Sequence, residues 1–472
     1  MNRLPPFTVQ DIVRATQGAL VAGDLGIPVS GVAIDSRALA VGEAFFAIHG
    51  HRLDGHAFLG EAAARGAACL VVHALSDDVP ANVPLVLVED TTRALGRLGA
   101  WHRGRFDIPV VAVTGSNGKT TTKELAAGVL ATRWEVLRPE RSFNNQWGLP
   151  LTLLRLTPEH QAVVLEIGTN ARGEVAALAA LAAPTVGVVT TVAAVHTEFL
   201  GSLEGVREEK AGLVRALPVD GVAVLNADDP RVAAMAADTR ARVVTYGRSA
   251  RAQVRAVGEA VDDAQGLTIT LEVGGERQAV TLALAGRHNV GNALAAAAVG
   301  VALGVSLADV ARGLAGVRPV AGRCVWRRAG DVTILDDTYN ASPVSVRAAL
   351  DTIAAHRRGR RVIVVLGDML ELGPLTDEAH REVGRQVAAL PADELIGVGR
   401  AMTLAVEAAR GAGLGEARHL TTFEDTVAHL LKRLTAGDLV LVKGSRGMRM
   451  ERVVDALVAR RARSGPERAD PE

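Results

Sequence analysis

One stretch of the sequence, residues 108–130, limits the possible folds more than any other. An apolar run over 108–113 predicts a buried strand, and a glycine-containing turn then leads to Gly118, Lys119 and Thr120 at the start of a helix. Successive backbone N–H groups in such a turn, together with the N-terminus of the helix, bind phosphate oxygens. The pattern therefore predicts a nucleotide phosphate site where a strand of a parallel sheet ends.

Within this stretch, we expect Lys119 to reach the terminal phosphates and the Thr120 hydroxyl to bind a magnesium ion. The spacing departs from the common phosphate-loop pattern, because Val113 stands where the first glycine would be. A glycine turn with a helix cap is the alternative, but it does not explain a lysine in a chain whose 52 basic residues include only five lysines. The predicted phosphate-binding residues are Thr114, Gly115, Ser116, Asn117, Gly118, Lys119, Thr120 and Thr121.

The rest of the chain alternates short β-branched runs with Ala- and Leu-rich helical stretches, which is typical of α/β architecture with mostly parallel sheets. A chain of 472 residues has room for about three domains. The predicted parts are a smaller amino-terminal α/β domain (1–107), a central P-loop-type ATPase domain with a mostly parallel sheet (108–317), a carboxyl-terminal Rossmann-like doubly wound domain (318–460) and a disordered tail (461–472). In the central domain, LTITLEV and QAVTLAL around GGER predict a hairpin.

Composition excludes several classes of function. Basic and acidic residues number 52 each, which argues against binding to nucleic acid or to an anionic membrane through bulk charge. Cys69 and Cys324 match no metal-ligand spacing, so we expect reduced, buried thiols in a cytoplasmic protein. The chain start lacks the apolar core of a signal peptide, and Pro184 interrupts the uncharged run 175–195, which predicts a helix end, a turn and a buried strand rather than a membrane span.

Polar residues follow several apolar runs of the central domain. Ligands of open parallel sheets gather at the carboxyl ends of the strands, where we expect Asn144, Glu166 and His196. Glu166 near the end of a buried run is costly unless it is paired or bound to metal, and the residues alone leave both explanations open. A single histidine such as His196 is more often a loop residue with satisfied hydrogen bonds.

Lys210 lies in a predicted amphipathic helix over 203–217. Its position follows the apolar stripe that includes Val206 and Leu213, away from the charged run 207–209 on the exposed side. A lysine that extends from the edge of the stripe to water is the simplest explanation.

Six motifs resemble, in order, those of the Mur ligases, the ATP-dependent amide-forming enzymes of peptidoglycan precursor synthesis: TGSNGKTTTKE, NNQWGLPLTLL, LEIGTN, HTEFLGSLEGVREEKAGLV, GRHNVGNALAAAAV and DDTYNASPVSVRAAL. The resemblance covers essentially the whole chain. The amino-terminal DSRALAVGEAFFAIHGHRLDGHAF is similar to the domain shared by the third- and fourth-step ligases, and LGDMLELG and VKGSRGMRMERVV resemble members that add D-alanyl-D-alanine. The Asp-Asn-Pro-Arg signature of the diaminopimelate-adding members is absent.

The resemblance implies that ATP phosphorylates a carboxylate of UDP-N-acetylmuramoyl-tripeptide and that the amine of D-alanyl-D-alanine then displaces the phosphate. It implies that Thr120 and Glu166 hold one Mg²⁺ and that His196 helps to hold a second, with Lys119 and Asn144 among the catalytic residues. Lys210 matches a position at which several members carry a carbamate formed with carbon dioxide. The position suits this reaction, because an apolar helix face favours the neutral amine and an arginine would stay protonated.

The resemblance also implies the other binding residues. The candidates for contact with adenine are His288, Asn289 and Asn292, where a helix N-cap at Asn289 is the alternative. The candidates for closing over the nucleotide are Arg323, Asp336 or Asp337, Tyr339 and Asn340. The candidates for the carboxylate of the acceptor are Lys443, Ser445 and Arg446, with a solvated turn as the alternative. The candidates for contact with the UDP-sugar are Ser36, Arg37, Arg52 and Asp54, with surface salt bridges as the alternative.

We further expect a hinge at 318–322 and, from the family, a monomer. The alternatives among enzymes are a tripeptide-forming Mur ligase and a folylpolyglutamate synthase. The alternative from another class is a regulatory nucleotide-binding switch that hydrolyses ATP without an amine acceptor.

Overall fold

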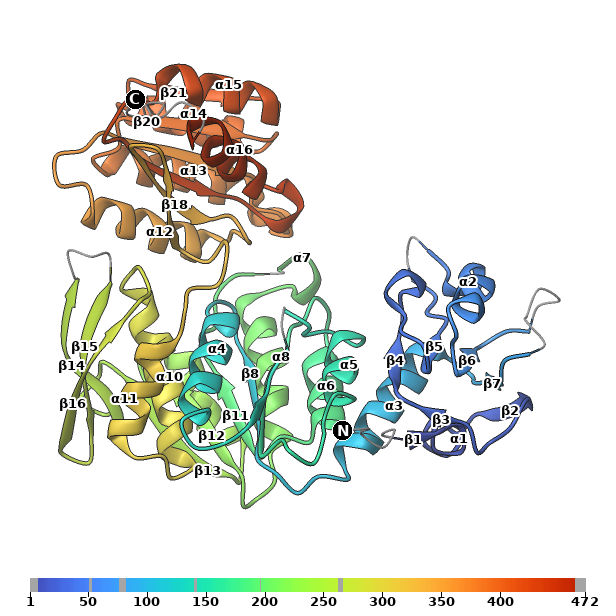
Figure 1. Ribbon diagram of the computed structural model, residues 1–472. Coiled ribbons are helices and arrows are strands. Elements are labelled where there is room, and N and C mark those ends of the chain that lie inside the picture. Colours follow the sequence, from blue (N-terminus) through green and yellow to red (C-terminus); the bar gives the residue numbers. More distant parts are fainter. Residues whose placement is uncertain are drawn as a thin grey trace, which may run out of the picture.

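The computed structural model describes residues 7–50, 53–75, 82–139, 142–195, 197–261 and 266–462. Three α/β bodies follow one another along the chain, with the amino-terminal body to one side of the central one and the carboxyl-terminal body above it (Figure 1). A nine-, a six- and a five-stranded sheet form their centres. The predicted fold class is confirmed, and each of these sheets lies within one predicted domain.

The amino-terminal body contains the five-stranded sheet, in the order β2-β7-β6-β5-β4. Its strands are β2 (Ala19–Ala22), β4 (Gly31–Ala33), β5 (Glu43–Phe46), β6 (Cys69–Val72) and β7 (Leu85–Leu87), of which only β2 pairs antiparallel. A separate short pair joins β1 (Phe7–Thr8) to β3 (Pro28–Val29). The helices of this body are α1 (Val9–Thr16), α2 (Leu59–Ala64) and α3 (Thr91–Arg103).

The central body contains the nine-stranded sheet, in the order β16-β15-β14-β13-β12-β11-β8-β10-β9. The parallel strands are β8 (Val110–Thr114), β9 (Val136–Leu137), β10 (Ala162–Glu166), β11 (Val186–Val189), β12 (Val222–Asn226), β13 (Arg242–Gly247) and β14 (Val254–Val261). The predicted hairpin is confirmed as β15 (Leu267–Val273) and β16 (Glu276–Leu282), which Gly274 and Gly275 join, both with positive φ.

Helices cover both faces of this sheet. Those on one face are α4 (Lys119–Leu130), α10 (His288–Ala302) and α11 (Leu307–Gly316), and those on the other are α5 (Gly148–Leu153), α6 (Glu174–Ala182) and α8 (Leu203–Arg215). The short α7 (Thr197–Leu200) and α9 (Pro230–Ala233) lie in connections. Because α6 and β11 occupy the uncharged run 175–195, the predicted helix end, turn and buried strand are confirmed. None of the helices in the described ranges is long and apolar enough to cross a membrane.

The carboxyl-terminal body is doubly wound, as predicted, around a sheet in the order β17-β18-β22-β19-β20-β21. Its strands are β17 (Val325–Ala329), β18 (Val332–Asp337), β19 (Val362–Gly367), β20 (Glu394–Val398), β21 (Ala417–Leu420) and β22 (Leu439–Lys443), with only β17 antiparallel. Its helices are α12 (Pro343–Ala355), α13 (Thr376–Ala389), α14 (Met402–Gly411), α15 (Phe423–Arg433) and α16 (Glu451–Ala462). Because α16 extends to Ala462, the first two residues of the predicted tail are helical, and the rest of the tail lies outside the described residues.

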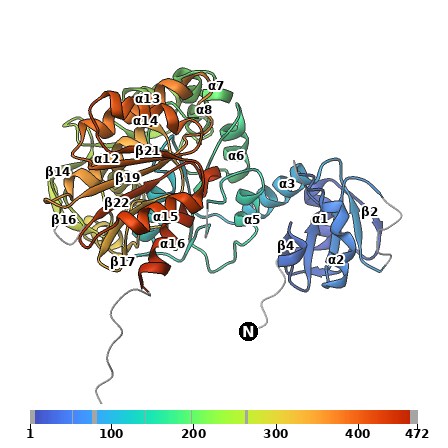
Figure 2. The ribbon, with the colours of Figure 1, turned by 90° about the horizontal axis from the view of Figure 1, so that it is seen from above.

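The helix α3 packs against helices of two bodies. It packs on α1 in the amino-terminal body and on α5 and α6 in the central body, and Figure 2 shows it between the two. The Trp147 indole donates a hydrogen bond to the Thr92 hydroxyl at 3.0 Å, and the Arg103 guanidinium donates one to the Ala182 carbonyl at 3.2 Å. The amino-terminal body is therefore joined to the central one by a packed helix as well as by the chain.

Candidate active site

The phosphate loop follows β8, which lies inside the sheet between β10 and β11. Gly115 and Gly118 have φ of 143° and 83°, a conformation that favours glycine. A Cβ at Gly115 would collide with Thr190, and one at Gly118 would collide with Asn292. Both glycines are thus required by backbone conformation and by close packing, as expected for a loop whose N–H groups face a ligand.

Lys119 begins α4 and turns back over the loop. Its amine donates a hydrogen bond to the Gly115 carbonyl at 2.7 Å, and burial lowers the pKa of this amine. The other loop residues are also held: Ser116 donates to the Ala193 carbonyl at 3.1 Å and Thr114 to the Ile167 carbonyl at 2.9 Å. Thr121 lies in the first turn of α4.

Glu166 is the centre of a buried polar network. The residue is 1% exposed, and its carboxylate accepts hydrogen bonds from the Thr120 hydroxyl at 2.8 Å and from the Asn144 amide at 2.7 Å. The parallel register of β8 and β10 places Glu166 beside Val113, directly before the loop. Arg323 adds a hydrogen bond of 2.9 Å to the same Thr120 hydroxyl. Four of the predicted residues therefore meet, since Arg323 was also a candidate for nucleotide binding.

Oxygen atoms dominate this network, and oxygen is the ligand that Mg²⁺ prefers. Among the described residues, no group of three or more His, Cys, Asp or Glu side chains could hold a metal ion. Thr120 and Glu166 fit a magnesium ion that takes its further ligands from a nucleotide, because Mg²⁺ is commonly bound by one or two carboxylates plus substrate phosphates. His196, the expected ligand of a second ion, lies outside the described residues.

Lys210 is 1% exposed, so its amine does not extend to water. Burial, and secondarily the charge of Lys119, lowers the pKa of the Lys210 amine to about 7. The expectation that Glu209 lies on the exposed side of α8 is wrong, because Glu209 is 7% exposed and accepts hydrogen bonds from the start of α6. The stripe of apolar residues did not reveal that α6 covers this side of the helix.

The stretch expected to meet adenine forms the start of α10. Asn289 lies inside the first turn and donates its amide to the Ala285 carbonyl at 2.7 Å, so the N-cap alternative is wrong. Asn292 donates to Asn289 at 2.8 Å and accepts from the Thr122 hydroxyl of α4 at 3.2 Å. His288 is exposed at the first position of the helix.

In the described part of the chain, two side chains of the carboxyl-terminal body form hydrogen bonds with the phosphate-loop residues. Besides Arg323, the Ser342 hydroxyl donates a hydrogen bond to the Asn117 side-chain oxygen at 3.1 Å. The Arg323 guanidinium lies 3.8 Å from the ring centroid of Tyr339, and that of Arg446 lies 5.6 Å from it. Sequence reasoning missed Ser342, although the Ser-Pro pair before a helical run could have indicated a cap at the end of a strand-to-helix loop.

The residues expected to bind the acceptor carboxylate differ in exposure. Lys443 is buried and pairs with Asp337 at 2.5 Å, across the neighbouring ends of β22 and β18, and it also donates to the Asn340 carbonyl. Ser445 is buried too, and its hydroxyl accepts from the backbone N–H of Leu370. The solvated-turn alternative is therefore wrong for both. Of the three acceptor candidates, Arg446 is the exposed one, with 64% of its side chain accessible. Asp336, the alternative to Asp337, is buried and accepts a hydrogen bond from the Thr338 hydroxyl.

Among the described residues, the hydrogen bonds and ion pairs of the amino-terminal candidates stay within their own body. Ser36 is buried and donates to Glu61 at 2.7 Å, whereas Arg37 pairs with Asp35 at 2.8 Å and is exposed. Asp54 caps a 3₁₀ turn through the His56 N–H, and this hydrogen bond lowers the pKa of the Asp54 carboxyl to about 2. Arg52 lies outside the described residues. For Arg37, the structure shows the surface salt bridge that was the alternative to a contact with the UDP-sugar.

Family models match all three bodies. "Mur ligase family, catalytic domain" matches residues 28–103, "Mur ligase middle domain" matches 113–300, and "Mur ligase, glutamate ligase domain" matches 322–446. The UDP-N-acetylmuramoyl-tripeptide–D-alanyl-D-alanine ligase of Escherichia coli is 37% identical over 458 residues, which cover 95% of this chain and 98% of that protein. The ligase of the same name from Bacillus subtilis is 33% identical over 455 residues, covering 96% of this chain and 98% of that protein.

Solved structures agree with these relatives. A crystal structure of MurF from Acinetobacter baumannii superposes with a TM-score of 0.89 at 31% identity and covers 97% of this chain and 99% of that chain. MurF ligase from Thermotoga maritima in complex with ADP superposes with a TM-score of 0.80 at 27% identity, covering 92% of this chain and 98% of that chain.

Proposed function

Since the chain belongs to the Mur ligase family, we propose that it adds D-alanyl-D-alanine to UDP-N-acetylmuramoyl-tripeptide at the expense of ATP. The observation that carries this function is identity along nearly the full length of relatives that bear this name, 37% for the one from Escherichia coli. The phosphate loop, the buried Glu166 and the buried Lys210 supply chemistry suited to it. The reaction makes peptidoglycan precursor, and the nucleotide ATP binds at the phosphate loop.

Three anionic groups have to meet in this reaction: the attacking carboxylate of the tripeptide and the β- and γ-phosphates of ATP. The N–H groups of the loop and the Lys119 amine offset the charge of the phosphates. Lys119 donates to the Gly115 carbonyl in the described structure, so its amine has to exchange this partner for a phosphate oxygen. Arg323 is placed to add a second cation from the carboxyl-terminal body.

Thr120 and Glu166 would hold a magnesium ion, which would neutralise phosphate charge and polarise the γ-phosphoryl group. Asn144 donates to one carboxylate oxygen of Glu166 at 2.7 Å and so fixes the direction of the other. Because the Thr120 hydroxyl donates to that second oxygen at 2.8 Å, both ligands already face the same point.

Lys210 is the residue for which we propose a carbamate. The neutral amine attacks carbon dioxide, a C–N bond forms and one proton leaves to water, which turns the neutral amine into an anionic carbamate. A pKa of about 7 keeps a substantial neutral fraction at physiological pH. The anion would support the magnesium site, together with His196.

The other two bodies would bind the substrates. Arg323 and Tyr339 would close over the nucleotide, with Asp337 holding Lys443 in place at the same edge. Arg446 would bind the carboxylate of D-alanyl-D-alanine, since its side chain is exposed. The proposed UDP-sugar contacts are Ser36, Arg37, Asp54 and Arg52. Gly322, with φ of 70°, lies at the end of the proposed hinge over 318–322.

One assay tests this function: phosphate release from Mg-ATP and UDP-N-acetylmuramoyl-tripeptide, with and without D-alanyl-D-alanine. We expect release that depends on the dipeptide and a new amide product in equal amount. Release that is independent of the dipeptide would contradict the ligase function and favour a nucleotide switch. The cytoplasmic location and the monomeric state stay predictions, which fractionation and light scattering would test.

A further inference from the structure

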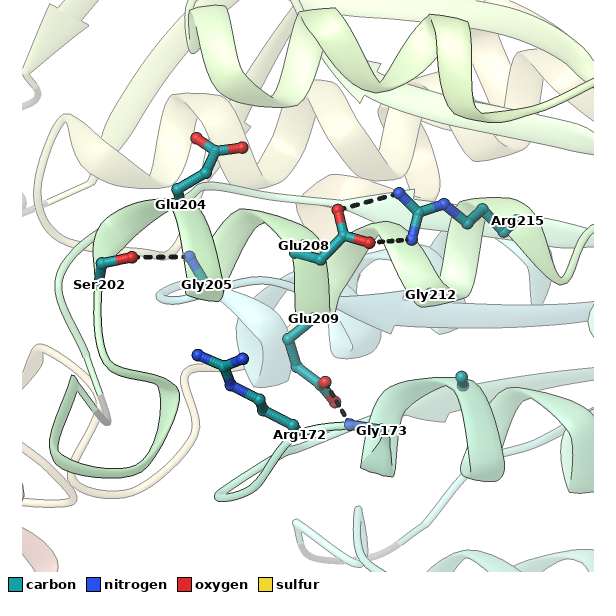
Figure 3. Close-up of a pocket in the computed structure, with 10 residues that line it drawn as sticks. Arg172, Gly173, Ser202, Glu204, Gly205, Glu208, Glu209, Gly212 and Arg215 are labelled. Carbon is teal, nitrogen blue, oxygen red and sulfur yellow. Dashed lines mark hydrogen bonds and ion pairs between the residues drawn. The ribbon is translucent and has the colours of Figure 1, made fainter.

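Glu209 is a buried carboxylate directly before Lys210. Figure 3 shows its side chain extending from α8 to the start of α6, where it meets Gly173. The neighbouring Glu208 instead lies along the surface of α8 and pairs with Arg215. The two glutamates are thus adjacent in sequence but differ in surroundings, with Glu209 7% exposed and the Glu208 side chain 57% exposed.

Three hydrogen bonds hold the Glu209 carboxylate. One oxygen accepts the backbone N–H of Gly173 at 2.6 Å, and the other accepts the backbone N–H of Val175 at 2.7 Å and the Thr169 hydroxyl at 3.2 Å. The Thr169 hydroxyl shares its one proton with the Ala171 carbonyl, which lies closer, at 2.7 Å. The first N–H groups of a helix have no partner within the helix and carry partial positive charge. The start of α6 therefore stabilises Glu209 as an anion and offsets the cost of burying it.

These bonds join two parts of the chain that each carry a proposed magnesium ligand. Thr169 lies three residues after Glu166, which ends β10, and Glu209 immediately precedes Lys210 on α8. The short segment between Glu166 and Thr169 is also fixed, because the backbone N–H of Gly168 donates a hydrogen bond to the Asn144 carbonyl at 2.9 Å. These hydrogen bonds restrict how far the end of β10 and the helix α8 can move relative to each other.

We propose that Glu209 is a positioning residue for the amide-forming reaction: it fixes α8 against the loop after β10 and so sets the separation between the Lys210 amine and the Glu166 carboxylate. The inference rests on the proposed function, because both partners are proposed ligands of the magnesium site. A displacement of about 1 Å in a catalytic group can cost roughly 100-fold in rate. Residues that orient metal ligands without touching the metal cost about 10- to 100-fold in metal affinity or activity when they are replaced.

Glu209→Gln tests this role. The neutral amide has one acceptor oxygen, and its NH₂ group would face an N–H of α6, so the bridge loosens. The matched control, Glu208→Gln, removes the same charge one residue earlier. For each variant, Mn²⁺ binding is measured by EPR titration with a non-hydrolysable ATP analogue and bicarbonate present, alongside kcat, the KM for ATP and thermal unfolding.

We expect Glu209→Gln to weaken Mn²⁺ binding and to lower kcat, each about tenfold, with the KM for ATP within about twofold of wild type. For Glu208→Gln, we expect the Mn²⁺ affinity, kcat and the KM for ATP to stay within about twofold of wild type, with little change in Tm. A folded Glu209→Gln protein with a lower Tm and wild-type Mn²⁺ affinity would overturn the inference. Absence of dipeptide-dependent activity in the wild type would instead overturn the proposed function, so the two failures are distinguishable.

Thr169→Val provides a second variant that keeps the shape of the side chain and the carboxylate of Glu209. It removes the longest of the three hydrogen bonds to Glu209 and also the bond from the same hydroxyl to the Ala171 carbonyl, so we expect about threefold weaker Mn²⁺ binding with a small fall in Tm. If Glu209→Gln does not fold, this variant decides: wild-type Mn²⁺ affinity in Thr169→Val would then overturn the inference.

Discussion

The phosphate-loop region and the proposed UDP-sugar region differ in where their polar side chains find partners. At the phosphate loop, Thr120 bonds to Glu166, 46 residues away, and to Arg323, 203 residues away. In the amino-terminal body, Arg37 bonds to Asp35, only two residues away. The first site is assembled by tertiary structure, whereas in the second only the side chain of the buried Ser36 has a distant partner, Glu61, and the described contacts of Arg37 and Asp54 include short-range ones near the surface.

Burial explains the difference. Glu166 and Lys210, each 1% exposed, would be costly to bury without partners or a ligand, so their surroundings have to be arranged by the fold. Arg37 is exposed and can exchange Asp35 for a substrate phosphate at little cost. Sites that neutralise charge away from water are therefore built in advance, whereas a surface that binds a large substrate can rearrange.

The largest effect should come from Lys210→Arg. The guanidinium keeps the positive charge but stays protonated and cannot form a carbamate, so we expect kcat to fall by roughly 100- to 1000-fold. The measurement is dipeptide-dependent phosphate release. The control is Lys432→Arg, because Lys432 is exposed on α15 and should tolerate the exchange. Near-normal activity of Lys210→Arg would show that the buried Lys210 is not needed as a carbamate. The contrast between a buried, preformed site and an exposed one would then lose its main support.

The next effect is on stability. Asp337→Asn leaves the buried Lys443 amine, 2% exposed, without its ion-pair partner, and breaking a buried pair on one side costs about 3 kcal/mol of unfolding free energy. The same exchange at Asp35, which pairs with the exposed Arg37, should leave the unfolding free energy unchanged within error. Urea denaturation of both variants measures the difference. Equal losses would show that burial does not separate the two pairs.

A smaller effect should appear in the pH dependence of the free energy of unfolding. Burial lowers the pKa of Lys210 from its ordinary 10.5 to about 7, so between these values the unfolded chain holds a proton that the folded chain has released. The free energy of unfolding therefore rises with pH, by about 1 kcal/mol per pH unit from this group. Denaturation at pH 7, 8 and 9 without bicarbonate should show that Lys210→Met removes this slope, whereas Lys432→Met retains it. A slope that survives in Lys210→Met would come from another group.

The smallest effect should come from Arg37→Ala. Loss of one exposed guanidinium should raise the KM for the UDP-linked tripeptide about three- to tenfold and leave the KM for ATP unchanged. Steady-state kinetics with each substrate varied in turn measures this, and Arg14→Ala, on the exposed side of α1, serves as the control. A similar rise for both substrates would indicate that the amino-terminal body influences the phosphate loop directly.

Much of the fold could be predicted because its signals are local. The alternation of β-branched runs and helical stretches predicted the α/β class, and LTITLEV and QAVTLAL predicted the hairpin β15–β16. The strand, turn and Gly118-Lys119-Thr120 predicted the phosphate loop, since one continuous segment forms it. The joint role of α3 could not be predicted, because its packing on α5 and α6 depends on surfaces that come together only in the folded chain.

The candidate site divides in the same way. Sequence alone determined which residues the predicted phosphate loop contains and that Lys210 follows an apolar helix face. The structure added why Gly115 and Gly118 are needed. Tertiary structure decided that Lys443 is paired with Asp337 and that Glu209 is buried. Helical periodicity tells which side of α8 is apolar, but it does not tell what packs against the polar side. The start of α6 lies there, and its first N–H groups bind the Glu209 carboxylate. A residue whose position in the sequence suggests the surface is therefore buried between the two helices.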